Sequence, residues 1–351
     1  MIFLLSIACQ SPSSQSENQE KQASVADTMT VIEKDSTIKI RRKEQLRNAS
    51  HVACIDGNND GIDDPILFNE GTLFWGEERL ELGGGVQELL RNNNTLWIGT
   101  GFGKEFRDAA MTLHKFEQGK LETIWSASQS RNQITDLALL GDQLYISTFS
   151  TGTNISGGWL TDSQNGKSIA PKFEANMAMQ QKPLPERENT LIVGRLYGDE
   201  PRADGDLLLI ENGTRRTLPN KRGVRTLEVT DINQDGHSDL LVADGWHYQY
   251  AAMGMARVQL YMGPTFEDVR TVAIFEPDYT INNIEVHQNG QWLLVQGTQT
   301  VYLLTPSPYG WQRHRVAPTT ESGSSTFCYD KEGSYILVAG TPSTLYAIET
   351  P

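Results

Sequence analysis

The chain has few of the residues that the common catalytic motifs require. Its 351 residues include three cysteines and six histidines. The sequence contains no G-x-S-x-G nucleophile motif, no H-E-x-x-H zinc motif and no glycine-rich phosphate loop. The histidines are scattered and form no paired metal motif. These absences exclude the familiar serine-hydrolase, zinc-protease and nucleotide-binding signatures.

Positive charge is also scarce. Lys and Arg total 30 against 44 Asp and Glu, so the formal net charge is -14. This balance argues against binding nucleic acid or an anionic membrane face through electrostatics, and it suits calcium and cationic or neutral partners. With 38% hydrophobic and 21% charged residues, the composition is that of a soluble globular protein with room for one large or two ordinary domains.

The N-terminal apolar stretch is too short to span a bilayer. Residues 1–9 end in a small residue followed by Cys9, and this segment resembles a bacterial lipoprotein signal with Cys9 as the lipidated residue. A truncated signal peptide and a fortuitous apolar start are the alternatives. Residues 10–33 begin with a run of Ser, Gln, Asn and Glu, which predicts a flexible tether. The expected location is extracytoplasmic, in a bacterial cell envelope or secreted, with membrane attachment only through the lipid.

Two acidic loops, at residues 56–64 and 231–239, share the pattern D-x-N-x-D-G-x-x-D. Side-chain oxygens at positions 1, 3, 5 and 9, a carbonyl at position 7 and a glycine at position 6 are typical of a calcium loop. Position 12 is Leu67 or Val242, inside a short apolar run, so an EF-hand helix is excluded and the loops join two strands. The predicted calcium ligands are Asp56, Asn58, Asp60, Ile62 and Asp64, and Asp231, Asn233, Asp235, His237 and Asp239.

The segment from Leu227 to Gly245 resembles an FG-GAP/VCBS repeat, the blade unit of integrin-α-like β-propellers. The resemblance implies a propeller with calcium in the loop between the first two strands of a blade. Only two of the repeats carry the full motif. The metal-dependent ligand capture of integrins uses a separate inserted domain, so that activity is not carried over.

The same succession of strands recurs along residues 34–351 about every 46 residues, a period typical of propeller blades. We therefore predict an all-β fold, a seven-bladed β-propeller. The predicted first strands are His51–Asp56, Val86–Arg91, Ile134–Leu140, Phe173–Gln180, Arg225–Asp231, Asn283–His287 and Ser325–Asp330. The predicted second strands are Ile66–Asn69, Thr95–Gly99, Gln143–Thr148, Thr190–Gly194, Asp239–Ala243, Trp292–Gln296 and Tyr335–Ala339.

The seventh repeat ends without a fourth strand. Thr37–Lys43 alternates like a strand, and we expect it to pair with the last blade and close the ring, which removes an exposed sheet edge. Cys54 and Cys328 then become neighbours, and a disulfide is one possibility. The sequence favours the other possibility, in which they are two small buried hydrophobic residues.

Long connections between second and third strands are expected in blades two to five. Such loops on a rigid scaffold commonly carry binding function, and aromatic rings beside Arg and Asp suit a glycan or polar ligand. The candidate ligand-binding residues are Arg107, Trp159, Arg195, Tyr197, Asp199, Arg202, Trp246, His247 and Tyr248. For any one of them a structural role is the commoner outcome.

Two classes of function follow. The favoured one is a calcium-stabilised binding or scaffold module for a glycan, peptide or protein partner. The alternative is a propeller enzyme, such as a polysaccharide lyase or hydrolase or a quinone-dependent dehydrogenase. Its best candidate base is His247 with Asp244 or Asp199. Without a catalytic motif, enzymatic activity is the less favoured reading.

Overall fold

The computed structural model describes most of the chain after residue 37. The described residues are 38–103, 105–130, 132–140, 143–150, 158–162, 179–187, 190–196, 205–212, 214–220, 222–244, 255–277, 279–308, 310–318 and 324–349. Every described residue belongs to one unit of the chain, Val31–Pro351.

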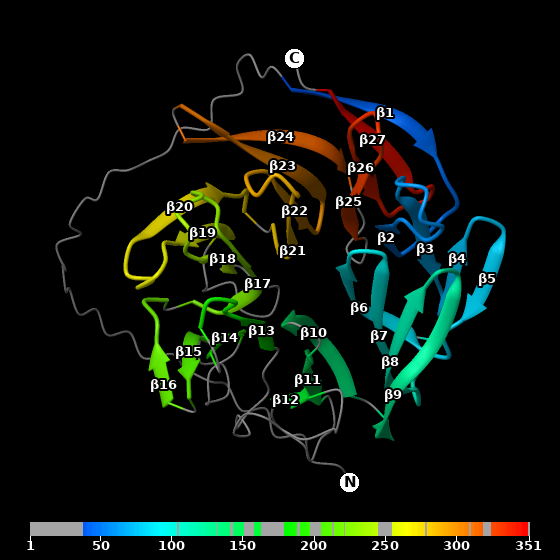
Figure 1. Cartoon of the computed structure of the whole chain (residues 1–351), viewed down its shortest axis with the longest axis horizontal. Helices are drawn as coiled ribbons and strands as arrows, with labels where there is room; N and C mark the ends of the chain where they lie inside the picture. Colours follow the sequence, from blue (N-terminus) through cyan, green and yellow to red (C-terminus); the bar gives the residue numbers. More distant parts are fainter. Residues whose placement is uncertain are drawn as a thin grey trace, which may run out of the picture. The chain divides into compact units, whose positions relative to one another are not determined.

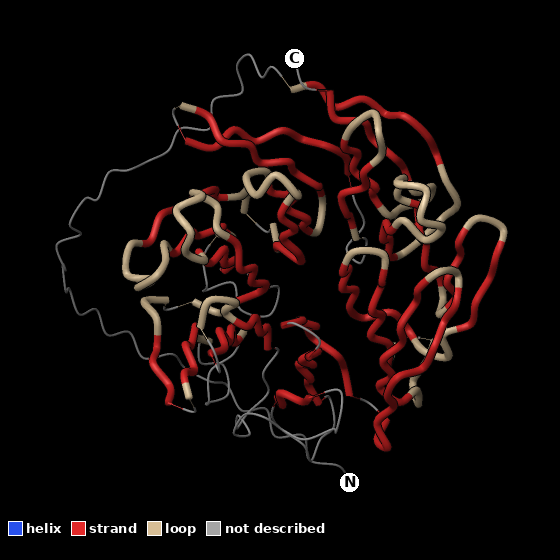
Figure 2. Tube along the Cα trace, viewed as in Figure 1, coloured by secondary structure: helices blue, strands red, loops and turns tan. Residues whose placement is uncertain are grey.

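The described residues form strands and loops without any helix (Figure 2). The strands assemble into six four-stranded antiparallel sheets and one three-stranded sheet (Figure 1). No helix suited by length and hydropathy to crossing a bilayer occurs in this part of the chain.

The sheets follow one another along the chain. The first contains β2 (His51–Ile55), β3 (Asp64–Asn69), β4 (Thr72–Trp75) and β5 (Glu78–Glu81). The second contains β6 (Gly85–Asn92), β7 (Thr95–Gly101), β8 (Ala110–Glu117) and β9 (Lys120–Ser130). The three-stranded sheet contains β10 (Asn132–Leu140), β11 (Gln143–Ser150) and β12 (Gly158–Asp162). Next come β13 (Met179–Pro183), β14 (Thr190–Arg195), β15 (Leu207–Glu211) and β16 (Thr214–Thr217).

The remaining sheets lie in the last third of the chain. One contains β17 (Val224–Thr230), β18 (Asp239–Asp244), β19 (Arg257–Tyr261) and β20 (Val269–Ile274). Another contains β21 (Ile281–Val286), β22 (Leu293–Gly297), β23 (Thr300–Ser307) and β24 (Gly310–Pro318). The last contains β25 (Ser325–Tyr329), β26 (Ser334–Val338), β27 (Thr344–Glu349) and, on its outer edge, β1 (Lys39–Gln45).

Consecutive sheets contact one another around a ring. The first strands touch in the order β2–β6–β10–β13–β17–β21, then β22 touches β25, and β25 touches β2 again (Figure 1). A ring of consecutive antiparallel sheets, each starting at the centre, is a β-propeller. The described residues show six four-stranded blades, with the three-stranded sheet β10–β12 between two of them.

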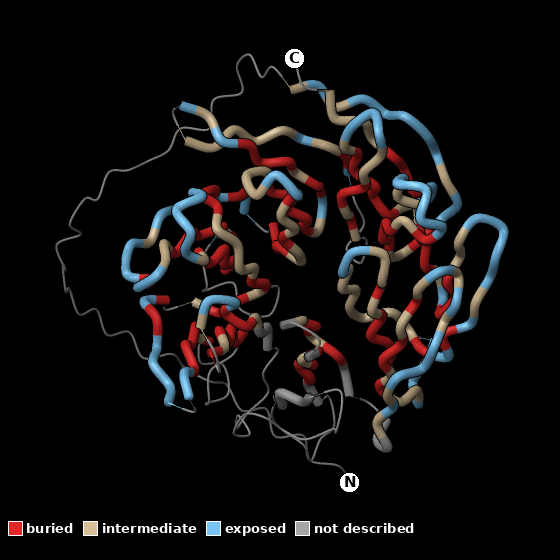
Figure 3. The backbone as a smooth tube through the Cα atoms, in the orientation of Figure 1, coloured by how far each residue is buried: buried red, intermediate tan, exposed pale blue. Residues whose placement is uncertain are grey.

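The hydrophobic core lies between neighbouring sheets. One cluster packs Phe68 and Leu73 of the first sheet against Ile98 and Phe116 of the second, and similar clusters occupy other interfaces. Every residue of β18 is buried, because a second strand is covered by sheets on both faces. The outer strands β5 and β16 are mostly exposed, and the buried residues lie between the sheets (Figure 3).

A β-bulge interrupts several first strands at a corresponding position. The register shifts before Glu88 in β6, Asp136 in β10, Thr226 in β17 and Asn283 in β21. A bulge leaves one extra residue unpaired and turns the next side chain to a new direction. All four residues that follow a bulge line the same central cavity.

The strand predictions agree closely with the observed strands, except at β13. The prediction placed a first strand at Phe173–Gln180, whereas the strand that pairs with β14 is Met179–Pro183. Residues 173–178 lie outside the described part of the chain. The predicted strand ends at Gln180, whereas the observed strand extends over further polar residues that include Lys182, which lines the central cavity.

The two blade-opening cysteines are bonded. Cys54 in β2 and Cys328 in β25 form a disulfide with their Cα atoms 5.3 Å apart. The preference for two unbonded buried cysteines was therefore wrong. The bond can form because β2 and β25 are neighbouring first strands, and both cysteine side chains lie in one apolar cluster. In the same sheet β1 pairs with β27, with Lys39 opposite Glu349.

Candidate functional site

The first strands enclose a central cavity of about 820 Å³. Its wall combines apolar residues with titratable side chains from consecutive sheets. The charged and titratable residues that line it are His51, Glu88, Arg91, Asp136, Lys182, Glu228, Glu285, His287 and Tyr329. A concave pocket with a few convergent polar groups is the first candidate for a ligand-binding site.

Lys182 joins three sheets across the wall of this cavity. Its Nζ lies 3.4 Å from Asp136 Oδ1 of β10 and 3.3 Å from Glu228 Oε1 of β17. Burial alone would lower the pKa of Lys182, but the carboxylates of Asp136, Glu228 and Glu88 outweigh burial and raise it. Lys182 is therefore an ammonium ion held by acids from neighbouring blades.

Glu88 lies beside Lys182 and its two acids, but the charge of Lys182 does not offset the cost of burying the Glu88 carboxylate. Burial, followed by the charge of Asp136, raises the pKa of Glu88 to about 8, although Lys182 acts in the opposite direction. One Glu88 oxygen accepts a hydrogen bond from the Leu89 backbone N–H at 3.3 Å. Near neutral pH this carboxyl group holds a proton for most of the time.

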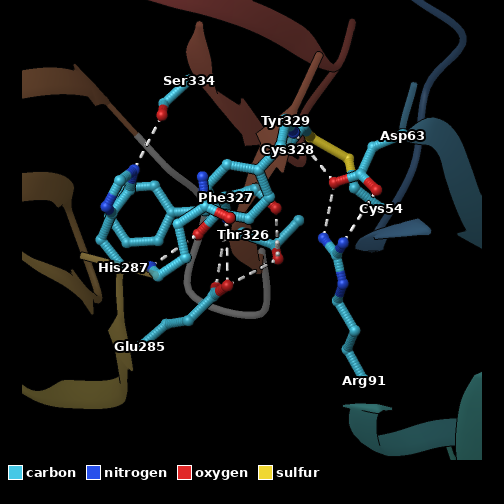
Figure 4. Close-up of polar contacts among 11 residues, drawn as sticks. Cys54, Asp63, Arg91, Glu285, His287, Thr326, Phe327, Cys328, Tyr329 and Ser334 are labelled. Carbon is cyan, nitrogen blue, oxygen red and sulfur yellow. Dashed lines mark hydrogen bonds and ion pairs between the residues drawn. A yellow bond between two sulfur atoms is a disulfide. The ribbon is translucent and has the colours of Figure 1, made fainter. Parts of the chain in front are cut away.

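Glu285 contacts the next blade (Figure 4). Its carboxylate accepts hydrogen bonds from the Phe327 backbone N–H at 3.2 and 3.3 Å and from Thr326 Oγ1 at 3.1 Å. Burial raises the pKa of Glu285 to about 7, while these hydrogen bonds and the charge of Arg91 limit the rise. A carboxyl group that titrates near neutral pH inside a cavity is a frequent feature of functional sites.

The first acidic loop is tied to the cavity wall through its eighth residue. Asp63 binds the Arg91 guanidinium through two hydrogen bonds of 2.6 and 2.8 Å (Figure 4). The same carboxylate accepts the Tyr329 backbone N–H at 2.9 Å. In the second loop the eighth residue is Ser238, whose Oγ donates to Glu186 at 2.6 Å. Each loop thus fixes an adjacent blade with this side chain.

His287 is a structural residue of the same region. Its Nδ1 accepts the Asn289 backbone N–H at 3.1 Å, so its Nε2 carries the proton and donates to Ser334 Oγ at 2.8 Å. Burial lowers the pKa of His287, and its ring packs edge-on against Phe327 with centroids 4.8 Å apart. Both ring nitrogens are satisfied in the neutral form, which leaves no free base.

The two acidic loops have the same local structure. In the first, Asp56 accepts the backbone N–H groups of Asp60 at 3.0 Å and Gly61 at 2.9 Å. In the second, Asp231 accepts the equivalent groups of residues 235 and 236 at 3.0 and 2.8 Å. Gly61 and Gly236 have φ angles of 82° and 90°, where a side chain is disfavoured. The glycine at position 6 is therefore needed for the turn.

The two loops differ at their ninth residues. Asp64 Oδ2 is buried and lacks a hydrogen-bond partner among the described residues. The Asp239 oxygens accept the Gly263 N–H at 2.8 Å and the Ile232 N–H at 3.2 Å. The donor types suit a hard cation, and the orphaned Asp64 oxygen is a position where one would be compensated. Nevertheless, nowhere in the described structure do three His, Cys, Asp or Glu side chains form a group able to hold a metal.

Few of the candidate ligand-binding residues can be placed. Arg107 is exposed in the long connection between β7 and β8. Arg195 is 6% exposed and binds the Asp206 carboxylate, with Nη2 2.6 Å from Oδ2, so it has a structural partner. The Trp159 side chain, Tyr197, Asp199, Arg202, Trp246, His247, Tyr248 and the lipidation candidate Cys9 lie outside the described residues.

Asp244, the candidate partner of a His247 base, is committed elsewhere. Its side chain is fully buried and accepts hydrogen bonds from Arg257 Nε and Nη2, both at 2.7 Å. Arg222 Nη1 lies 3.5 Å from the same carboxylate. Asp244 is thus bound by two guanidinium groups, which gives it a structural role within its blade.

The sequence analysis missed the acidic residues of the cavity. Glu88, Asp136, Glu228 and Glu285 each lie within a first strand, next to apolar residues such as Leu89, Leu137, Val229 and Val286. A charged residue inside a buried strand is costly and needs a reason. Acidic residues recur in the first strand of several repeats, and this recurrence could have indicated the cavity site from the sequence.

Fold and cavity together define a β-propeller protein with a charged central cavity. No protein-family model matches the sequence, and no curated protein is similar to it. Hydrazine synthase of Kuenenia stuttgartiensis has a similar structure, with a TM-score of 0.55 and 9% identity over 86% of this chain and 96% of that one. A Desulfotomaculum acetoxidans protein of unknown function has a TM-score of 0.48 and 10% identity, covering 86% and 99%. At this identity the likeness shows the fold alone.

Proposed function

We propose that this protein is a binding module whose ligand occupies the central cavity of the propeller. The observation that carries the proposal is the cavity of about 820 Å³ with titratable groups from consecutive first strands. Buried acids such as Glu88 and Glu285 are costly to a fold that needs only rigidity, which favours a binding role for them. Glycans, peptides and small polar compounds are the candidate ligands, and the long connections of blades two to five are candidates for additional contacts.

We also propose that the ring has seven blades closed by the N-terminal strand. The support is that β10 of the three-stranded sheet contacts both β6 and β13, as a blade between them would. The pairing of β1 with β27 gives the last sheet its fourth strand from the other end of the chain. Closure of this kind removes the edge that an incomplete last blade would expose.

Calcium in the two acidic loops, and with it an FG-GAP/VCBS-like blade, is part of the proposal. Its support is the shared pattern, the matching turns at Gly61 and Gly236, and the uncompensated Asp64 oxygen. In this role the ion would be held by the loop oxygens and would stiffen the connection between two strands. The clamp from Asp63 to Arg91 would then pass that stiffness to the cavity wall.

An extracytoplasmic location, with lipid attachment at Cys9 or by secretion, completes the proposed function. Disulfides persist in oxidising compartments, so the Cys54–Cys328 bond supports export. An enzymatic role is not favoured by the described residues, because Asp244 is held in ion pairs and His287 is satisfied by Asn289 and Ser334.

The test is a thermal-shift screen of the propeller, residues 34–351, against glycans, short peptides, amines and carboxylic acids. A bound ligand raises the melting temperature, because it binds the folded state alone. Asn283 lines the cavity, and an Asn283→Phe variant would fill part of it. Asp268→Asn, an exposed change in an ion pair with Arg270, is the control.

We expect at least one compound to stabilise the wild type and the control but not the filled variant. A screen without any stabilising compound would contradict the proposal. Equal stabilisation of the filled variant would place the ligand elsewhere.

A further inference from the structure

The described wall of the central cavity has more acid than base. It carries the carboxyl groups of Glu88, Asp136, Glu228 and Glu285, and Lys182 is the cation among them. Arg91 is already matched, because Asp63 holds it through two hydrogen bonds. With all four acids ionised, the wall would retain an excess of negative charge that burial makes costly.

The wall also contains a hydroxyl without a protein partner. Thr226 is 3% exposed, it lines the cavity, and its side chain has no hydrogen bond to any described residue. A ligand in the cavity could therefore form a hydrogen bond with this hydroxyl. Glu228, two residues along β17, lies on the same side of the strand and lines the same space.

The arrangement suits an organic cation better than a metal ion. A metal needs several ligands gathered within bonding distance, and the described residues contain no group of three His, Cys, Asp or Glu of that kind. The cavity acids come instead from separate strands around a volume of about 820 Å³. An ammonium group donates three hydrogen bonds and carries the compensating charge, so it can contact a carboxylate and a hydroxyl together.

We propose that the central cavity binds a small organic compound carrying a primary ammonium group, with Glu228 and Glu285 as its carboxylate contacts and Thr226 as a hydroxyl contact. Lys182 occupies one part of the wall in the same manner, as an ammonium ion between Asp136 and Glu228. The proposal deepens the proposed function, and it rests on the cavity being the ligand site.

Binding of such a cation is linked to the release of protons. Glu88 faces Asp136, Lys182 and Glu228, and Glu285 faces Arg91, Glu228 and the Phe327 N–H. In the free protein these surroundings hold the pKa of Glu88 at about 8 and that of Glu285 at about 7. An ammonium group favours the ionised carboxylates, so affinity rises with pH between about 6 and 8. Alkylammonium groups, like a lysine side chain, stay charged in that range.

The experiment compares matched pairs of amine and neutral compounds by calorimetry on residues 34–351. The pairs are 1,4-diaminobutane with 1,4-butanediol and cyclohexylamine with cyclohexanol. We expect at least one amine to bind, its neutral counterpart not to bind, and the affinity to increase by about tenfold or more from pH 6 to pH 8 for each proton released. Titrations in two buffers of different ionisation enthalpy measure the proton release directly.

Two variants place the amine in the cavity. Glu285→Gln keeps an acceptor for the Phe327 N–H but removes the charge, and it should weaken binding at least tenfold and reduce the dependence on pH. Thr226→Val keeps the shape of the side chain and removes its hydroxyl, and it should weaken binding at least threefold. The Asp268→Asn control should bind as the wild type does. Thr226→Val preserves the test if Glu285→Gln fails to fold.

The outcomes separate this inference from the proposed function. If neutral or anionic compounds bind in the cavity and the amines do not, the cation inference is wrong and the binding module stands. If no compound of any kind binds, both are wrong. If amines bind to Glu285→Gln and to Thr226→Val as tightly as to the wild type, they bind outside this site and the inference is again wrong.

Discussion

Reducing the Cys54–Cys328 disulfide should strongly lower the stability of the propeller. The bond joins β2, in the first sheet, to β25, in the last, so it prevents the unfolded chain from separating these strands. Reduction breaks the S–S bond and removes no side chain. It therefore isolates the effect of the cross-link from the loss of buried volume that a substitution would cause.

The expected magnitude follows from the size of the closed loop. For a sequence separation of 274 residues, the chain-entropy relation gives a loss of about 5.6 kcal/mol, an upper value because unfolded chains retain structure. Native disulfides commonly contribute about 2 to 5 kcal/mol, and we expect a loss in that range. A change of that size is a large share of the total stability of a typical domain.

The assay is equilibrium urea unfolding of residues 34–351 followed by tryptophan fluorescence, with and without a phosphine reductant. Mass spectrometry establishes the state of the cysteines before unfolding. The control is the Cys54→Ala/Cys328→Ala variant, whose unfolding curve should be the same with and without reductant. Its midpoint should lie below that of the oxidised wild type.

Two results would refute the reasoning. Free thiols in protein prepared without reductant would show that the bond does not form. A fully oxidised protein whose free energy of unfolding falls by less than about 0.5 kcal/mol on reduction would show that residual structure already keeps β2 and β25 together in the unfolded chain.

Three further predictions concern the metal, the pH dependence and the closing strand. Calcium at about 100 times its dissociation constant should stabilise the protein by about 2.7 kcal/mol, and a chelator or Asp235→Ala should reduce this; identical melting curves in all conditions would contradict the calcium loops. Burial raises the pKa of Glu285 from 4.5 to about 7, so between these values the folded protein retains a proton that the unfolded chain has lost. Stability should therefore fall as pH rises from about 4.5 to about 7 and level off above it, and this fall should be smaller in Glu285→Gln. An equal pH dependence in both proteins would refute the assignment. Deleting residues through Lys43 removes four of the six residue pairs between β1 and β27, together with the contacts of Ile40, and should cost about 2 kcal/mol or more. A truncated protein that melts at the same temperature as the full one would show that this part of β1 is dispensable.

Many strands of the propeller could be predicted from the sequence because second strands are buried on both faces. Runs such as Leu240–Ala243 are continuously apolar, and the observed β18 contains the whole of that run. First strands were harder to predict, since their inner residues face a cavity and not a hydrophobic core. Lys182 and its neighbours made β13 look unlike a strand, and its position was misplaced for that reason.

The candidate site was less predictable than the fold. A bulge before Glu88 and another before Asp136 direct these side chains into the cavity, and a bulge leaves no clear mark in a single sequence. The partner of each acid lies on another blade, as Glu285 and Phe327 show, so their proximity depends on the closed ring. Composition suggested a site on the long connections, where the described residues place Arg107 on the surface and Arg195 in an ion pair.

The pairing of β1 with β27 makes the propeller a candidate for circular permutation. Lys39 lies opposite Glu349, so a short linker would join these two residues in a chain that starts at β1, and that chain could be opened in a surface turn, for example after Gly76. In such a permutant the last sheet would be continuous in sequence, and Cys328 would precede Cys54 by a short stretch of chain. The disulfide would then close a much smaller loop, so the same covalent bond in the same folded structure would stabilise the permuted protein less.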